Sequence, residues 1–238
     1  MLEIDGLSVR FGGLQALDGV SLHIAAGEIV GLVGPNGAGK TTLFNAISGT
    51  VRAQQGTLRF AGETLAEFPA FMRARRGIGR TFQIPQPMHG LTVADHLTVA
   101  QRFGAGTVDA RAAADILALV GLTDKARADA ATELSLTELK ALEVAKALAT
   151  NPRLLLLDEV LAGLEMHGKR TFTQMLAEIH RLRNLAIVVI EHDIEAISTL
   201  CPRVAVLDFG RLIADGTPDI VFNDPAVIAS YTGVPAHA

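Results

Sequence analysis

A glycine-rich stretch of eight residues that ends in lysine and threonine carries the clearest chemistry in this sequence. Residues 34–41 read G-P-N-G-A-G-K-T and match the pattern G-x-x-x-x-G-K-[ST] of a phosphate-binding loop. Glycines let successive backbone N–H groups point at an anion, and a helix N-terminus adds partial positive charge. Lys40 is expected to reach the β- and γ-phosphates, and the Thr41 hydroxyl to hold Mg²⁺. We therefore predict a nucleoside triphosphate site formed by Gly34, Pro35, Asn36, Gly37, Ala38, Gly39, Lys40, Thr41 and Thr42.

The segments on either side of this loop match the strand and the helix that flank a phosphate-binding loop. Residues 28–33 are mostly apolar and predict a short buried strand, and residues 42–47 predict the first turns of a helix. The alternative is a glycine-rich turn that binds nothing. The lysine–threonine pair and the strand-to-helix context favour the phosphate site.

Two acidic residues follow a run of four leucines. Residues 154–157 are typical of a strand buried on both faces of a parallel sheet, and Asp158 and Glu159 come directly after them. We expect Asp158 to hold Mg²⁺ through water, as the acidic partner of Thr41. Glu159 is expected to polarise an attacking water as general base. The alternative is a solvated strand end without a ligand.

His192 follows the apolar strand predicted at residues 186–190. Ligands of open parallel sheets lie at the carboxyl ends of the strands, so we expect His192, the acidic pair and the phosphate loop to meet at one nucleotide. A histidine alone is weak evidence, since most histidines are structural.

Strand and helix patterns around these motifs predict an α/β fold. Further strands are expected at residues 2–10, 20–24, 56–60, 78–82, 204–207 and 212–214, and helices at 92–101, 109–120, 137–150, 166–183 and 225–230. An all-helical stretch inside a strand-rich chain indicates an inserted sub-domain, so we predict one domain with a mostly parallel core sheet at residues 1–83 and 151–238 and a helical sub-domain at residues 84–150.

Composition narrows the class of protein. Among 238 residues 49% are hydrophobic, enough for a core, and the net charge of −4 argues against a nucleic-acid partner. The single cysteine, Cys201, excludes an internal disulfide. The first residues do not resemble a signal peptide, and the apolar runs are too short to span a bilayer.

The sequence contains a basic run at residues 73–76. It is expected to be a solvated face, or else a contact surface near the phosphates or a partner.

Taken in order, these motifs resemble those of ATP-binding-cassette (ABC) ATPases over nearly the whole chain. Beside the phosphate loop, the acidic strand end and His192, the chain has a glutamine after a strand, Gln83, and a loop at residues 134–138 that corresponds to the family's signature loop. The resemblance implies a P-loop NTPase fold, with a RecA-like core that carries an N-terminal antiparallel β portion. It also implies ATP and Mg²⁺ as cofactors and a dimer that sandwiches two ATP molecules.

The resemblance also implies roles for four residues. The Phe11 position stacks on adenine, and the Gln83 position contacts Mg²⁺ and the attacking water and relays to a membrane subunit. The His192 position contacts the γ-phosphate. Ser135 of one protomer contacts the γ-phosphate bound by the other.

Three segments depart from the family pattern. The signature loop, commonly L-S-G-G-Q, here reads L-S-L-T-E, and Ser135 and Glu138 form the S-x-x-E pattern of a helix capping box. Thr137 replaces a glycine, and Glu138 adds negative charge near a phosphate; each is expected to weaken the closed dimer by about 1 kcal/mol. Val160 stands where proline is usual, and residues 162–165 read A-G-L-E instead of S-A-L-D.

Within the family, residues 12–17, 34–45, 80–85 and 227–231 resemble the ATPase subunits of branched-chain amino-acid importers. The implied partners are a second cassette, permease subunits and, indirectly, a solute-binding protein, with the chain on the cytoplasmic face of the inner membrane. The alternatives are an exporter ATPase for a lipid-linked substrate, a soluble cassette ATPase, and a signal-binding module that hydrolyses ATP poorly.

Overall fold

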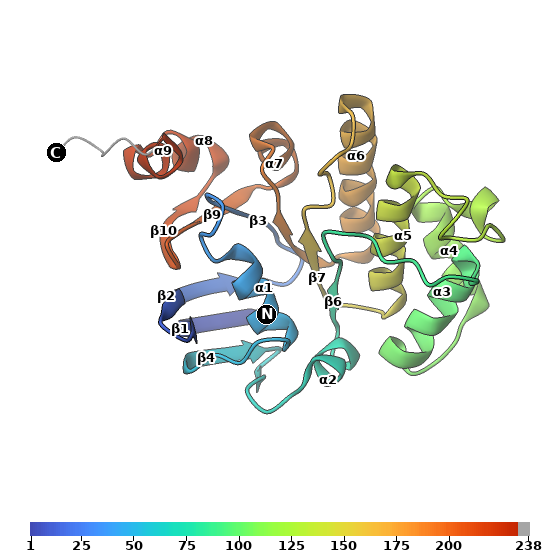
Figure 1. Cartoon of the computed structure of the whole chain (residues 1–238), viewed down its shortest axis with the longest axis horizontal. Helices are drawn as coiled ribbons and strands as arrows, with labels where there is room; N and C mark the ends of the chain where they lie inside the picture. Colours follow the sequence, from blue (N-terminus) through green and yellow to red (C-terminus); the bar gives the residue numbers. More distant parts are fainter. Residues whose placement is uncertain (233–238) are drawn as a thin grey trace. The chain divides into compact units, whose positions relative to one another are not determined.

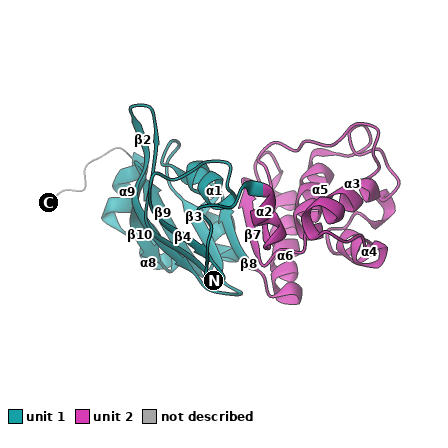
Figure 2. Cartoon of the chain, turned by 90° about the horizontal axis from the view of Figure 1, so that it is seen from below, with its two compact units in different colours: residues 1–70, 186–238 teal, residues 71–185 magenta. Residues whose placement is uncertain are grey.

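The computed structural model describes residues 1–232 and divides the chain into two compact units (Figure 2). Unit 1 combines Met1–Ala70 with the described part of Ala186–Ala238, and unit 2 is the continuous segment Phe71–Leu185. The predicted helical sub-domain, residues 84–150, falls entirely within unit 2. The proposed division of the chain into a RecA-like core and this sub-domain stays a prediction.

Unit 1 contains an antiparallel sheet in the order β2-β1-β4-β5 (Figure 1). Its strands are β1 (Leu2–Phe11), β2 (Leu14–Ile24), β4 (Gln55–Phe60) and β5 (Glu63–Thr64). Residues of β1 alternate between buried and exposed near its start, the pattern of a sheet with one buried face. The predicted antiparallel portion is therefore present, and it holds Phe11 at the end of β1.

Unit 1 also contains parallel strands that lead to the predicted site. Strand β3 (Ile29–Val33) pairs in parallel with β8 (Ala186–Ile190) and β9 (Arg203–Asp208), and β10 (Arg211–Gly216) is antiparallel to β9. Every residue of β3 and β8 is buried, as continuous apolar runs predict. The helices of this unit are α1 (Lys40–Ser48), α7 (Ile194–Leu200), α8 (Pro218–Phe222) and α9 (Pro225–Thr232).

Unit 2 pairs two parallel strands, β6 (Ile78–Arg80) and β7 (Leu154–Asp158). The four leucines of β7 are completely buried, as predicted. The other elements are α2 (Ala70–Arg75, which starts at the unit boundary), α3 (Val93–Ala100), a π-helical segment (Gln101–Ala105), α4 (Ala110–Leu119), a 3₁₀ turn (Thr123–Lys125), α5 (Leu136–Ala149) and α6 (Met166–Arg183). Strand β6 ends two residues earlier than predicted, and the chain leaves the sheet at Phe82 and Gln83, which are exposed.

The basic run at residues 73–76 is not a uniformly solvated face. It lies at the end of α2, where Arg73 is buried and burial lowers the pKa of its guanidinium. Successive residues of a helix point about 100° apart, so a run of four arginine-rich positions necessarily faces several directions. The prediction was therefore wrong for Arg73.

In the described part of the chain, no helix is both long enough and apolar enough to cross a bilayer.

Cys201 provides a testable property of the core of unit 1. Burial, with a smaller contribution from the Glu191 carboxylate, raises the pKa of the Cys201 thiol from 9.0 to about 12. Because the thiolate is the reactive form, we expect alkylation of the native protein at about pH 8 to be at least ~100-fold slower than in concentrated urea. The raised pKa stabilises the fold below pH 9.0, and this contribution is lost as the pH rises toward about 12. Mass spectrometry after timed iodoacetamide labelling measures the ratio; equal rates would contradict the prediction.

Candidate functional site

The phosphate loop connects β3 to α1, as the motif predicts. Gly34, Gly37 and Gly39 all have positive φ, at 145°, 81° and 106°. A Cβ on Gly37 would meet no atom within 4 Å, so only the backbone conformation requires glycine there. Gly39 is the N-cap of α1, in the left-handed conformation. The loop therefore has the glycine-dependent backbone of an anion-binding turn that ends at a helix N-terminus.

The end of β9 and the β9–β10 turn pack against this loop. A Cβ on Gly34 would lie 2.0 Å from the Leu207 carbonyl oxygen, so no other residue fits. In the turn, the N–H of Gly210 donates to the carbonyl of Ala38 at 2.9 Å, and its carbonyl accepts from the N–H of Asp18 at 2.8 Å. The shape of the phosphate loop is thus fixed partly by residues about 170 positions away in the sequence. The motif alone did not indicate this contribution.

Lys40 is buried at the start of α1. Its ammonium donates to the carbonyl oxygens of Gly34 at 2.6 Å and Pro35 at 2.9 Å, so the loop itself holds the cation. This arrangement keeps a positive charge inside the turn, where it can pair with an anion that the backbone N–H groups bind.

In unit 2, Asp158 ends β7 as a buried carboxylate beside a buried arginine. Arg80 Nη2 donates to Asp158 Oδ2 at 3.1 Å, and both side chains are more than nine-tenths buried. The Asp158 N–H donates to the Thr81 hydroxyl at 3.1 Å. Because β6 and β7 are neighbouring parallel strands, their ends bring these three residues together. The pair therefore places a buried carboxylate, the ligand type that a divalent cation prefers, at the end of β7.

Glu159 lies one residue further, in a conformation that L-residues rarely adopt. Its φ is 49°, and its Oε2 accepts from Gln83 Nε2 at 2.5 Å. Its backbone carbonyl accepts from Lys140 Nζ at 2.9 Å and from the Ala162 N–H at 3.2 Å. The structure therefore brings Gln83 and Glu159 together, with their side chains in direct contact.

The remaining predicted residues of unit 1 lie at exposed positions. Phe11 is 49% exposed at the end of β1, and Thr41 is exposed on the first turn of α1. His192 is exposed two residues after β8, next to Asp193, which caps α7. An exposed aromatic ring and an exposed imidazole are available to a ligand; their roles stay predictions.

The available side chains suit Mg²⁺ by their chemistry. The Thr41 hydroxyl, the Asp158 carboxylate and the Gln83 amide all offer oxygen atoms, the ligand type that this ion prefers. Within residues 1–232 no three His, Cys, Asp or Glu residues form a cluster that could hold a metal. In unit 1 Thr41 offers such an oxygen, and in unit 2 Asp158 and Gln83 do. Mg²⁺ is usually held by few protein oxygens together with a ligand's phosphates.

Ser135 caps α5 through the predicted capping box. Its hydroxyl accepts from the Glu138 N–H at 3.4 Å, and Glu138 Oε2 accepts from both the N–H and the hydroxyl of Ser135 at 2.8 Å. The Ser135 N–H is the main cause that lowers the pKa of Glu138, and Lys125 pairs with that carboxylate at 3.6 Å. Glu138 thus occupies hydrogen bonds that a phosphate at this helix end would need.

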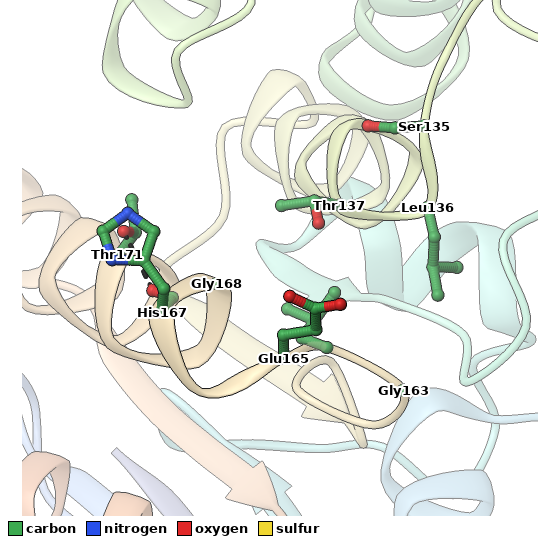
Figure 3. Close-up of a pocket in the computed structure, with 9 residues that line it drawn as sticks. Ser135, Leu136, Thr137, Gly163, Glu165, His167, Gly168 and Thr171 are labelled. Carbon is green, nitrogen blue, oxygen red and sulfur yellow. Dashed lines mark hydrogen bonds between the residues drawn. The ribbon is translucent and has the colours of Figure 1, made fainter.

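A cavity of about 560 Å³ lies between the start of α5 and the segment that leads into α6 (Figure 3). On both sides the cavity is lined by residues at which the chain departs from the common sequence of ABC ATPases: Leu136, Thr137, Gly163 and Glu165. Gly163 has a φ of 77°, and a Cβ there would lie 3.3 Å from Leu136 Cδ2. The larger residue at 136 therefore lies against the smaller residue at 163, where an added methyl group would be a tight fit.

Replacing Glu138 with glutamine tests the electrostatic effect of the altered loop. The amide keeps the shape of the cap but removes a negative charge from a helix N-terminus that would otherwise attract phosphate. We expect the steady-state ATPase rate to rise about fivefold, the equivalent of about 1 kcal/mol. Phosphate release measures it, with Glu133→Gln in the preceding segment as control. An unchanged or lower rate for Glu138→Gln would contradict this interpretation.

Three residues contact the predicted site residues but were not predicted to do so from the sequence: Arg80, Lys140 and Gly210. Arg80 was read only as part of a motif around Gln83. Lys140 had a signal, because it interrupts an apolar stretch of a predicted helix, where a buried charge needs a partner.

Comparisons with known proteins agree with this arrangement. The family model described as ABC transporter matches residues 17–162, and the model described as branched-chain amino acid ATP-binding cassette transporter matches residues 211–237. The branched-chain amino acid transport ATP-binding protein BraF of Pseudomonas aeruginosa is 35% identical, over 98% of each chain. LivG of Escherichia coli K12, with the same description, is also 35% identical over 98% of each chain. Among solved structures, the ADP conformation of MJ1267, an ATP-binding cassette of an ABC transporter, matches with a TM-score of 0.88, 28% identity and 98% coverage of both chains.

Proposed function

This chain belongs to the ABC transporter family, and we propose that it is the ATP-hydrolysing subunit of a membrane importer for branched-chain or related apolar amino acids. The observation that carries the proposal is the likeness to BraF and LivG over nearly the full length of each chain, joined by the separate match at residues 211–237. The importer is thereby favoured over the exporter and over a soluble cassette.

Different residues of the site would bind the nucleotide and hydrolyse it. In unit 1, the glycine loop and Lys40 would bind the phosphates, Phe11 would stack on adenine, and His192 would contact the γ-phosphate. In unit 2, Asp158 would bind Mg²⁺, and Glu159, held by Gln83, would take the proton from the attacking water. Mg²⁺, when bound with ATP, would neutralise charge on the phosphate oxygens. The proposal requires both sets to act on one nucleotide.

The same proposal includes the partners. A second cassette would present its Ser135 to the nucleotide bound by the first, so that ATP holds two protomers together. An exposed apolar surface on unit 2 supports docking to a permease, since such surfaces mark protein contacts: Phe71, Phe82, Ile84 and Phe103 are all more than half exposed. Gln83 lies beside Phe82 and Ile84, where it would link docking to Glu159. The chain would then work on the cytoplasmic face of the inner membrane.

Purification of the tagged chain from detergent-solubilised membranes tests the assignment. We expect permease subunits and a second cassette to be recovered with it, and transport of radiolabelled leucine in reconstituted vesicles to depend on ATP. A double variant, Phe82→Ser with Ile84→Ser, should reduce recovery of the permease while the isolated chain still hydrolyses ATP. Recovery of no membrane protein, or of ribosomes or DNA instead, would overturn the importer assignment.

A further inference from the structure

Lys140 is a buried lysine with a defined backbone partner. It lies in the second turn of α5 and is 5% exposed, and its Nζ donates to the Glu159 carbonyl at 2.9 Å. A lysine is almost never fully buried unless it is paired, because an ammonium taken out of water needs compensating hydrogen bonds. The backbone of Glu159 supplies one of these bonds.

Glu159 needs external support for its backbone. A glutamate at a φ of 49° has its Cβ close to its own carbonyl, and such conformations persist only where surrounding contacts fix them. The contacts come from three places: Lys140 and the Ala162 N–H on the carbonyl, and Gln83 on the carboxylate. The two donors on the carbonyl fix the Glu159–Val160 peptide, since a peptide is planar and rotates as one body. The direction of the side chain follows from that orientation.

Helix α5 connects this support to the loop at Ser135. Lys140 lies five residues after Ser135, roughly 7.5 Å along the helix axis at 1.5 Å per residue. Ser135 is the N-cap, so the loop and the lysine move together when the helix shifts as a rigid body.

We propose that Lys140 is a positioning residue that holds the backbone of Glu159 and ties it to the helix that Ser135 begins. This inference rests on the proposed role of Glu159 as general base. Its consequence is that a contact made by Ser135 with a nucleotide on the partner protomer would adjust the base of its own protomer. Occupancy of one ATP site would thereby influence hydrolysis at the other.

The test replaces Lys140 with methionine, which keeps the length and apolar stem but removes the donor. We expect kcat for ATP to fall about 10–100-fold, the scale of a misplaced catalytic group, while the Kd for MgATP stays within twofold of wild type. Arginine keeps a donor and should restore at least part of the rate. The Hill coefficient for ATP should fall toward 1 in Lys140→Met.

Lys146→Met is the matched control. Lys146 lies on the same helix and pairs with the Glu143 carboxylate at 2.6 Å, so its loss also removes a largely buried contact but does not touch Glu159. It should lower the unfolding midpoint without changing kcat. If Lys140→Met does not fold, Lys140→Leu, which also lacks a donor, decides instead, with Lys140→Arg as the variant that keeps one. Should Lys140→Leu bind MgATP normally and hydrolyse it within twofold of wild type, the inference is overturned.

Failure of this inference is distinguishable from failure of the proposed function. If Glu159→Gln keeps its rate, or wild type does not hydrolyse ATP, the proposed function fails. If Glu159→Gln is inactive but Lys140→Met turns over within twofold of wild type, only the role of Lys140 fails.

Discussion

Replacing Glu159 with glutamine is expected to lower the steady-state ATPase rate about 10²–10⁴-fold, the usual contribution of a general base. Glutamine has almost the same shape, and its amide oxygen can still accept the hydrogen bond from Gln83 Nε2. It cannot take a proton from water. The variant should therefore bind ATP with the affinity of wild type and accumulate as an ATP-bound dimer.

Three measurements check this result: phosphate release, ATP retained on the protein, and molar mass by light scattering with and without ATP. Glu178→Gln is the matched control, because Glu178 lies on the surface of α6, where it pairs with Arg181. It should hydrolyse ATP at the wild-type rate. A Glu159→Gln protein that kept more than a tenth of that rate would remove Glu159 from the role of base.

The largest expected effect on stability comes from Arg80. Substitution by methionine removes the Arg80 guanidinium from the Asp158 carboxylate, whose side chain is 5% exposed. Removing one member of a buried ion pair typically costs about 3–5 kcal/mol, because the other charge stays buried and uncompensated. The change also removes the weaker contact of the guanidinium with the Phe82 ring. We expect a clear decrease in the urea midpoint of unfolding.

A double variant separates the buried charge from simple loss of packing. Arg80→Met with Asp158→Asn removes both charges, so part of the lost stability should return. Arg181→Met, which breaks an exposed pair with Glu178, should leave the urea midpoint of unfolding close to that of wild type. Equal urea midpoints for Arg80→Met and wild type would show that the ion pair does not stabilise the fold. A double variant with a midpoint as low as that of Arg80→Met would exclude the buried charge as the cause.

Local patterns predicted much of this molecule because the relevant interactions are local. The capping box at Ser135 and Glu138 spans four residues, the glycines of the phosphate loop lie within six residues, and the leucines of β7 are adjacent. Sequence spacing is sufficient in such cases, since the contacting groups share one turn or one strand. The bounds of α6 and β8 were correct for the same reason.

Contacts between distant residues were not predictable from these patterns. Arg80 and Asp158 are 78 positions apart, and Gly210 is 172 positions from Ala38; only the pairing and packing of strands brings them together. Helix α7 was missed because it has seven residues, too few to show a helical period. Arg73 was misjudged because the charge of the run says nothing about which side of α2 faces inward.

The dependence of the phosphate loop on the β9–β10 turn has a consequence for the order in which the protein matures on the ribosome. The loop leaves the ribosome about 170 residues before Leu207 and Gly210, which fix its shape. Unit 2 is a continuous segment and can fold during synthesis, whereas unit 1 must wait for both of its segments. A nascent chain therefore completes its phosphate loop only after residue 210 has been made, and one that stops before residue 207 should not retain ATP.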